Sequence, residues 1–119
     1  MKILIIRFSS FGDVLLTTPV IRKIKDKYPD SEIDFIVYEN FSEAVSLNPN
    51  IRKLILFDRK KSRDRKYINE VVENLKKEKY DFVVDLHSKL LSRVIGKSLS
   101  DSRTEYLRYK KENGGKHYW

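Results

Sequence analysis

The chain lacks cysteine altogether and has only four glycines and three prolines among its 119 residues. Without cysteine it can form no disulfide bond, no thiolate nucleophile and no cysteine-ligated zinc or iron–sulfur centre. Neither the G-x-G-x-x-G dinucleotide loop nor the Walker phosphate loop is present. No Asp-x-Asp pair occurs, and two histidines, His87 and His117, cannot form a zinc site without several carboxylates. We therefore expect neither a metal nor a cofactor.

Long hydrophobic runs are also missing. A membrane-spanning helix needs about 20 apolar residues, and no run approaches that length. The first apolar run follows a single lysine and is too short for the core of a signal peptide. With 40% hydrophobic and 35% charged residues, the sequence predicts one globular, cytoplasmic domain.

Positive charge is abundant and uneven. The net charge of +8 favours anionic partners such as nucleic acid, acidic lipid headgroups or phosphorylated and carboxylated small molecules. Residues 59–66 alone hold six cations and one anion. Such a run is usually a solvated loop, but its arginines can also bind carboxylates or phosphates bidentately. The residues alone leave both roles open.

Four short apolar runs rich in β-branched residues predict strands that are buried on both faces. They are Lys2–Phe8, Ile33–Tyr38, Lys53–Phe57 and Asp81–Leu86. Helical periodicity fills the segments 14–28, 41–47 and 68–75 and begins again at Leu90. This alternation predicts an α/β fold, an open parallel sheet with helices on both faces. Pro19 either kinks the first helix or begins it, with Thr18 as the N-cap.

The turn after the first strand is the most informative segment. Ligands of open α/β sheets bind just outside the carboxyl ends of the strands, and this turn places Ser9, Ser10, Gly12 and Asp13 there. The hydroxyls, the bare backbone and the carboxylate suit a hydroxyl or phosphate ligand. Asp13 has two competing interpretations, a helix N-cap and a general base.

A second polar segment follows the fourth strand. Asp85 and His87 lie there, and a parallel sheet brings them to the same edge as the first turn. His87 is either a structural residue or a ligand for a sugar hydroxyl or phosphate near neutral pH.

Residues 1–21, with the turn Ser9-Ser10-Phe11-Gly12-Asp13-Val14 and the later Thr18-Pro19, resemble the opening of the ADP-heptose:lipopolysaccharide heptosyltransferases, glycosyltransferase family 9. Asp81–Ser88 is similar to the Asp-Leu-His/Gln segment of this family, and the resemblance extends to about Gly96. It implies a two-lobed GT-B fold. Residues 1–97 are then the Rossmann-like, acceptor-binding N-terminal lobe, and 98–119 a linker or incomplete next element. The resemblance further implies that the C-terminal donor lobe of the family is absent from this sequence.

The resemblance also implies a reaction. Asp13 would be the general base, taking the proton from an acceptor hydroxyl as that oxygen attacks the anomeric carbon of ADP-heptose. ADP would leave, the configuration would invert, and no metal would be needed. The expected substrate-binding residues lie in the first turn, after the fourth strand and in the basic run: Ser9, Ser10, Phe11, Gly12, His87, Arg59, Lys60, Lys61 and Arg63.

The expected partners are the anionic inner core of lipopolysaccharide as acceptor and ADP-heptose, which the missing lobe would bind. We expect the isolated chain to be inactive and able to associate with itself. Its expected location is the cytoplasm, either free or in peripheral contact with the inner membrane. An alternative is a stand-alone basic α/β module that binds nucleic acid or another anionic partner. No specific nucleic-acid motif supports that alternative.

Overall fold

The computed structural model describes residues 1–109. Five parallel strands form one sheet in the order β3-β2-β1-β4-β5. The strands are β1 (Lys2–Ile6), β2 (Glu32–Tyr38), β3 (Lys53–Phe57), β4 (Phe82–Asp85) and β5 (Glu105–Arg108). The helices are α1 (Phe11–Leu15), α2 (Thr18–Lys27), α3 (Arg65–Lys76) and α4 (Leu90–Leu99), with short 3₁₀ turns η1 (Glu39–Ala44) and η2 (Arg59–Lys61). The predicted α/β fold is confirmed.

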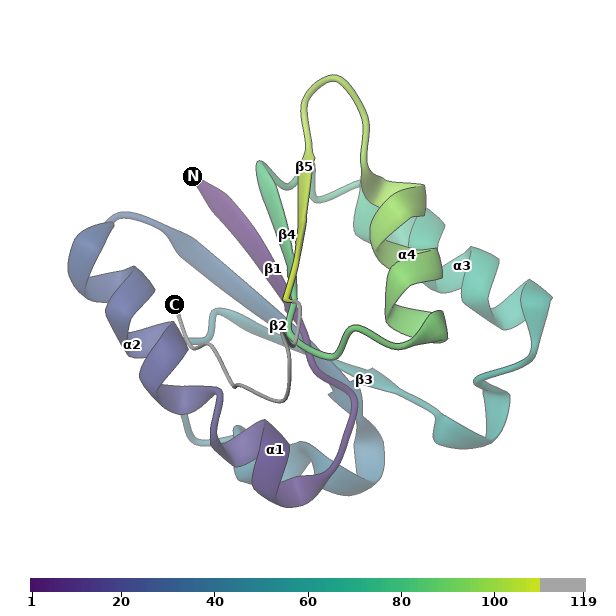
Figure 1. Cartoon of the computed structure of the whole chain (residues 1–119), viewed down its shortest axis with the longest axis horizontal. Coiled ribbons are helices and arrows are strands. Elements are labelled where there is room, and N and C mark those ends of the chain that lie inside the picture. Colours follow the sequence, from purple (N-terminus) through teal and green to yellow (C-terminus); the bar gives the residue numbers. More distant parts are fainter. Residues whose placement is uncertain (110–119) are drawn as a thin grey trace, which may run out of the picture.

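Helices cover both faces of the sheet, with α1 and α2 on one side and α3 and α4 on the other (Figure 1). The alternation of side chains along β1 explains the two cores that result. Leu4 and Ile6 pack with residues of α3 and α4, whereas Ile3 and Ile5 pack with Val14 and others on the α1–α2 side. Because β1 is buried on both faces, its sequence is a continuous apolar run.

The first helical segment is divided in two. α1 ends at Leu15, and α2 begins at Thr18 with Thr17 as its N-cap and Pro19 in its first turn. Pro19 is tolerated there because the first N–H groups of a helix have no intrahelical partner. Pro19 therefore lies at the start of a helix and does not kink one. The N-cap is Thr17, one residue before the predicted Thr18.

β5 was not predicted. Its residues, Glu-Tyr-Leu-Arg, alternate between exposed and half-buried and lack the apolar run of the other strands. It lies at the edge of the sheet beside β4. The expected lobe boundary at residue 97 falls inside α4, and the described part of the segment 98–119, residues 98–109, holds the end of α4 and this strand.

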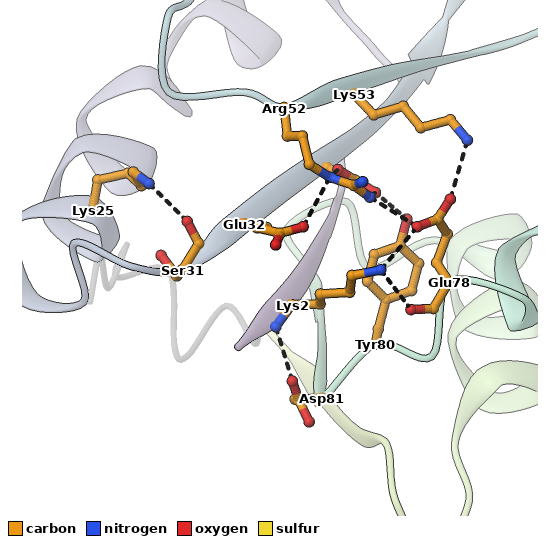
Figure 2. Close-up of polar contacts among 10 residues, drawn as sticks. Lys2, Lys25, Ser31, Glu32, Arg52, Lys53, Glu78, Tyr80 and Asp81 are labelled. Atoms are coloured by element: carbon orange, nitrogen blue, oxygen red, sulfur yellow. Dashed lines mark hydrogen bonds and ion pairs between the residues drawn. The ribbon is translucent and has the colours of Figure 1, made fainter.

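The amino-terminal edge of the sheet carries a network of ion pairs (Figure 2). The carboxylate of Asp34, which is fully buried, accepts hydrogen bonds from Arg52 at 3.0 and 2.7 Å and from the Tyr80 hydroxyl at 2.6 Å. Glu78 pairs with Lys2 and Lys53 at 3.2 Å and with Arg52 at 2.8 Å. These contacts connect β1, β2 and β3 to the loop before β4. Within residues 1–109, no helix is long and apolar enough to cross a membrane.

Candidate active site at the carboxyl edge

The chain order reverses between β1 and β4, which is the switch point where open α/β sheets bind their ligands. Ile6, the last residue of β1, is in register with Asp85, the last of β4. The first turn and the segment 86–88 leave these two strand ends side by side, and the Leu86 N–H donates to the Ile6 carbonyl at 3.0 Å. The two segments that the sequence assigned to the ligand edge are therefore neighbours.

The carboxylate of Asp13 lies in the first turn of α1, three residues after the N-cap Ser10. It accepts hydrogen bonds from the Ser10 hydroxyl at 3.0 Å and from the Ser10 N–H at 3.4 Å, and it pairs with Arg7 Nη2 at 3.0 Å. All three contacts reach Oδ2. Asp13 is thus not the N-cap itself but a partner of the N-cap, and within residues 1–109 no hydrogen bond or ion pair reaches its Oδ1.

Two opposing effects act on the charge of Asp13. Partial burial raises the pKa of this carboxyl, but the hydrogen bonds from Ser10 and the charge and hydrogen bond of Arg7 outweigh burial. The net pKa lies below the usual value of 3.8. The side chain is 51% exposed. Asp13 is therefore an accessible carboxylate that is ionised at neutral pH.

Arg7 is a site residue that the sequence analysis missed. Its Nη1 donates to the Leu86 carbonyl at 2.7 Å, while Nη2 pairs with Asp13. It therefore connects the end of β4 to the first turn. Its Nε is buried, and no residue in the described range 1–109 forms a hydrogen bond with it. Its place directly after an apolar run, where a cation is unusual, is the signal that could have identified it.

His87 packs its ring edge-on against Phe8, with 5.6 Å between ring centroids. Burial and then the charge of Arg7 lower its pKa to about 4, although Asp85 acts in the opposite direction. His87 is thus uncharged at neutral pH, and its Nδ1 is buried with no hydrogen-bond partner in the part of the chain that the structure describes. Of the two expected ligands, a neutral imidazole suits a hydroxyl better than a phosphate.

Asp85 has a structural role. Its Oδ1 accepts from the backbone N–H groups of His87 and Ser88 at 2.9 and 2.7 Å, which fixes the turn after β4. Its Oδ2 accepts from the Tyr106 hydroxyl at 2.6 Å. The ring of Tyr106 lies so close to Gly96 that a Cβ there would collide with it. β5 and α4 therefore hold the carboxylate that orients His87.

The basic run lies beyond β3 at the same edge. Asp58 caps η2 by accepting from the Lys60 N–H at 3.0 Å, and Lys61 lies over the ring of Tyr67 at 5.0 Å. Arg59, Lys60, Lys61 and Arg63 are all exposed.

A cleft of about 700 Å³ opens between this segment, α3 and α4. Two of the predicted site residues, Arg63 and His87, line it together with Arg65, Lys89 and Tyr38. Its walls thus combine three cations with apolar residues of α3 and α4, a lining suited to an anionic ligand. Arg59, Lys60 and Lys61 are not among the lining residues.

The remaining residues of the first turn are accessible. Ser10, Phe11 and Gly12 are exposed and Ser9 is half-buried. A Cβ at Gly12 would meet nothing within 4 Å, so a ligand can approach the backbone there. In the described part of the chain, no three acidic or histidine side chains are grouped so that they could hold a metal ion.

Comparison with known proteins gives a consistent picture. No protein-family model matches the chain. The chain is 34% identical over 92 residues to lipopolysaccharide heptosyltransferase 3 of Escherichia coli and 33% identical over 102 residues to lipopolysaccharide heptosyltransferase 1 of Campylobacter coli. These matches cover 75% and 84% of this chain but only 27% and 29% of the two relatives.

Solved structures extend the likeness. A family 9 glycosyl transferase from Veillonella parvula has a TM-score of 0.82 at 24% identity, covering 94% of this chain and 37% of that one, which establishes the shared fold. The heptosyltransferase WaaC of E. coli with ADP has a TM-score of 0.73 at 27% identity, covering 89% and 34%. The chain thus spans about a third of these proteins. Its resemblance to the heptosyltransferases of glycosyltransferase family 9 is confirmed in sequence and in fold, and the match is consistent with their N-terminal lobe.

Proposed function

We propose that this chain is the acceptor-binding N-terminal part of an inverting glycosyltransferase that transfers heptose from ADP-heptose to the inner core of lipopolysaccharide. The observation that carries the proposal is the position of Asp13. It is an ionised, accessible carboxylate at the switch point of the sheet, on the same edge as a cation-lined cleft. The likeness to heptosyltransferases supports the choice of sugar donor.

In this proposal the acceptor hydroxyl lies against Asp13 and donates its proton to Oδ1. As this proton is transferred, the hydroxyl oxygen attacks the anomeric carbon of the heptose from the face opposite to ADP. The bond to the ADP oxygen breaks, ADP leaves with its electron pair, and the configuration inverts. A one-step displacement of this kind needs a single base, so we propose no cofactor and no metal for the reaction.

The cleft residues would hold the anionic part of the acceptor. Arg63 and Lys89 would pair with carboxylates or phosphates, and the uncharged His87 would contact a hydroxyl. Arg59, Lys60 and Lys61 would attract the acceptor over a longer range from the rim. Ser9, Ser10, Phe11 and Gly12 would form the wall between acceptor and donor sugar.

The donor nucleotide would bind to a second lobe that these 119 residues do not contain. We therefore propose that the isolated chain binds acceptor but transfers sugar negligibly. Its proposed place is the cytoplasm, with peripheral contact with the inner membrane where the acceptor is presented. Self-association of the isolated chain stays a prediction.

An amide chemical-shift titration of the chain with an acidic inner-core saccharide tests the proposal, with a short DNA duplex as the comparison. We expect the saccharide to shift Ser9–Asp13 and His87. Shifts that are confined to 59–66, larger with DNA and abolished by salt would instead identify a generic basic module. That alternative gains no support from the relatives. It also gives Asp13 no role, because a carboxylate repels phosphates.

A further inference from the structure

Arg7 makes two directional contacts with one guanidinium. One terminal nitrogen holds the Leu86 carbonyl at 2.7 Å, and the other holds Asp13 Oδ2 at 3.0 Å. The Arg7 side chain is 20% exposed and the Asp13 side chain 51%, so solvent reaches the ion pair mainly from the Asp13 side. A lysine ammonium could pair with the carboxylate but lacks the rigid fork that reaches both groups at fixed angles.

The contacts of Asp13 divide its two oxygens into different roles. Arg7 and both donors of Ser10 reach Oδ2, while within residues 1–109 Oδ1 accepts no hydrogen bond. A carboxylate held on one side by three donors cannot rotate freely about its side-chain torsions. The unoccupied Oδ1 is then presented in a fixed direction, as efficient proton transfer requires.

We propose that Arg7 is a positioning residue that clamps Oδ2 of Asp13 to the end of β4, so that Oδ1 is the atom that receives the acceptor proton. This inference rests on the proposed function for its chemistry, whereas the clamp itself is a property of the chain. Within residues 1–109, Arg7 interacts electrostatically with Asp13, and so does His87 when it is protonated. The uncharged state of His87 leaves Arg7 as the cation that acts on Asp13 at neutral pH.

Nuclear magnetic resonance of the 119-residue chain tests the clamp directly. The carboxyl carbon of Asp13 is titrated, and its side-chain rotamer is measured from three-bond couplings. The variants are Arg7→Gln, Arg7→Lys and the matched control Lys76→Gln, which removes a positive charge from the exposed Glu73–Lys76 pair on α3.

We expect Arg7→Gln to raise the pKa of Asp13 and to release its side chain into several rotamers. Arg7→Lys should keep the pKa lower than Arg7→Gln does, because the charge remains, yet lose the single rotamer. Lys76→Gln should change neither. If Arg7 merely supported the end of β4, Arg7→Gln would move the amides of 86–88 and leave Asp13 as it is, and that result would overturn the proposal.

A reciprocal variant covers the case in which Arg7→Gln does not fold. Asp13→Asn should accelerate exchange of the Arg7 guanidinium protons, whereas unchanged exchange would contradict the clamp. Saccharide binding distinguishes the two proposals. If the saccharide fails to shift the carboxyl edge while Asp13 still responds to Arg7, the proposed function is wrong and the clamp stands. If the saccharide shifts the carboxyl edge but the Asp13 pKa and rotamer do not change in Arg7→Gln, the clamp is wrong and the proposed function stands.

Discussion

The two edges of the sheet use the same kinds of residue in opposite ways. At the amino-terminal edge, both oxygens of Asp34 are hydrogen-bonded. Glu78 pairs there with three cations (Figure 2). At the carboxyl edge, Asp13 uses one oxygen, and among residues 1–109 the buried Arg7 Nε and His87 Nδ1 find no hydrogen-bond partner. Buried polar groups are normally satisfied, so the exceptions indicate where a ligand or water belongs.

The difference separates stability from function. A carboxylate with all its acceptor sites occupied inside the chain can contribute to folding but cannot accept a proton from a substrate. A carboxylate that keeps one oxygen accessible can do so, and it gives up some stabilisation in return. We therefore expect substitutions at the two edges to have different consequences, which the following predictions exploit.

The largest effect is expected for Asp13→Asn. In a transferase in which this chain supplies the N-terminal lobe, loss of the general base should reduce kcat by about 10²- to 10⁴-fold. KM for the acceptor should change little, because an asparagine keeps the shape of the side chain. Steady-state kinetics measure both. The isolated chain should unfold at nearly the same urea concentration with and without the substitution. A large loss of stability without loss of turnover would show that Asp13 serves folding and not catalysis.

Asp34→Asn should produce the opposite pattern. The substitution removes the buried charge that Arg52 and Tyr80 donate to, which should lower the free energy of unfolding by about 1–3 kcal/mol. Urea denaturation followed by circular dichroism measures this loss, with the exposed Asp26→Asn on α2 as the matched control. Saccharide-induced shifts at the carboxyl edge should be retained. A destabilisation no larger than that of Asp26→Asn would show that the network contributes little.

Acid should weaken the amino-terminal edge through Glu78. Hydrogen bonds from Arg52, Lys53 and Lys2 lower the pKa of Glu78 from 4.5 to about 2. Between these values the unfolded chain binds the proton and the folded chain does not, so stability is present above about pH 4.5 and is lost as the pH falls toward 2. The free energy of unfolding, measured by urea denaturation at several pH values in this range, should depend less on pH for Glu78→Gln than for the unsubstituted chain. Equal slopes would contradict the ion pairs of Glu78.

The sequence predicted the features of the two edges that depend on strong local patterns. The apolar run Lys2–Phe8 and its counterparts located four strands, and parallel strands necessarily bring residues 9–13 and 85–88 to one edge. β5 was not predicted because an edge strand needs no continuous apolar run. The role of Arg7 was not predicted because it depends on two contact partners, one of them 79 positions away in the sequence. The same holds for the contact between Asp34 and Tyr80, which are separated by 46 positions.

The smallest effect is expected in the cleft. Arg63 lines it but is exposed, so a single ion pair with an acidic saccharide should be worth only about threefold in affinity. Arg63→Gln should therefore weaken binding about threefold in a chemical-shift titration at low salt and make no difference at high salt, where the pair is screened. Lys76→Gln removes an equal charge on α3 outside the cleft lining and should leave affinity unchanged. Equal weakening by both variants would mean that net charge attracts the ligand, and the cleft would then have no specific part in binding.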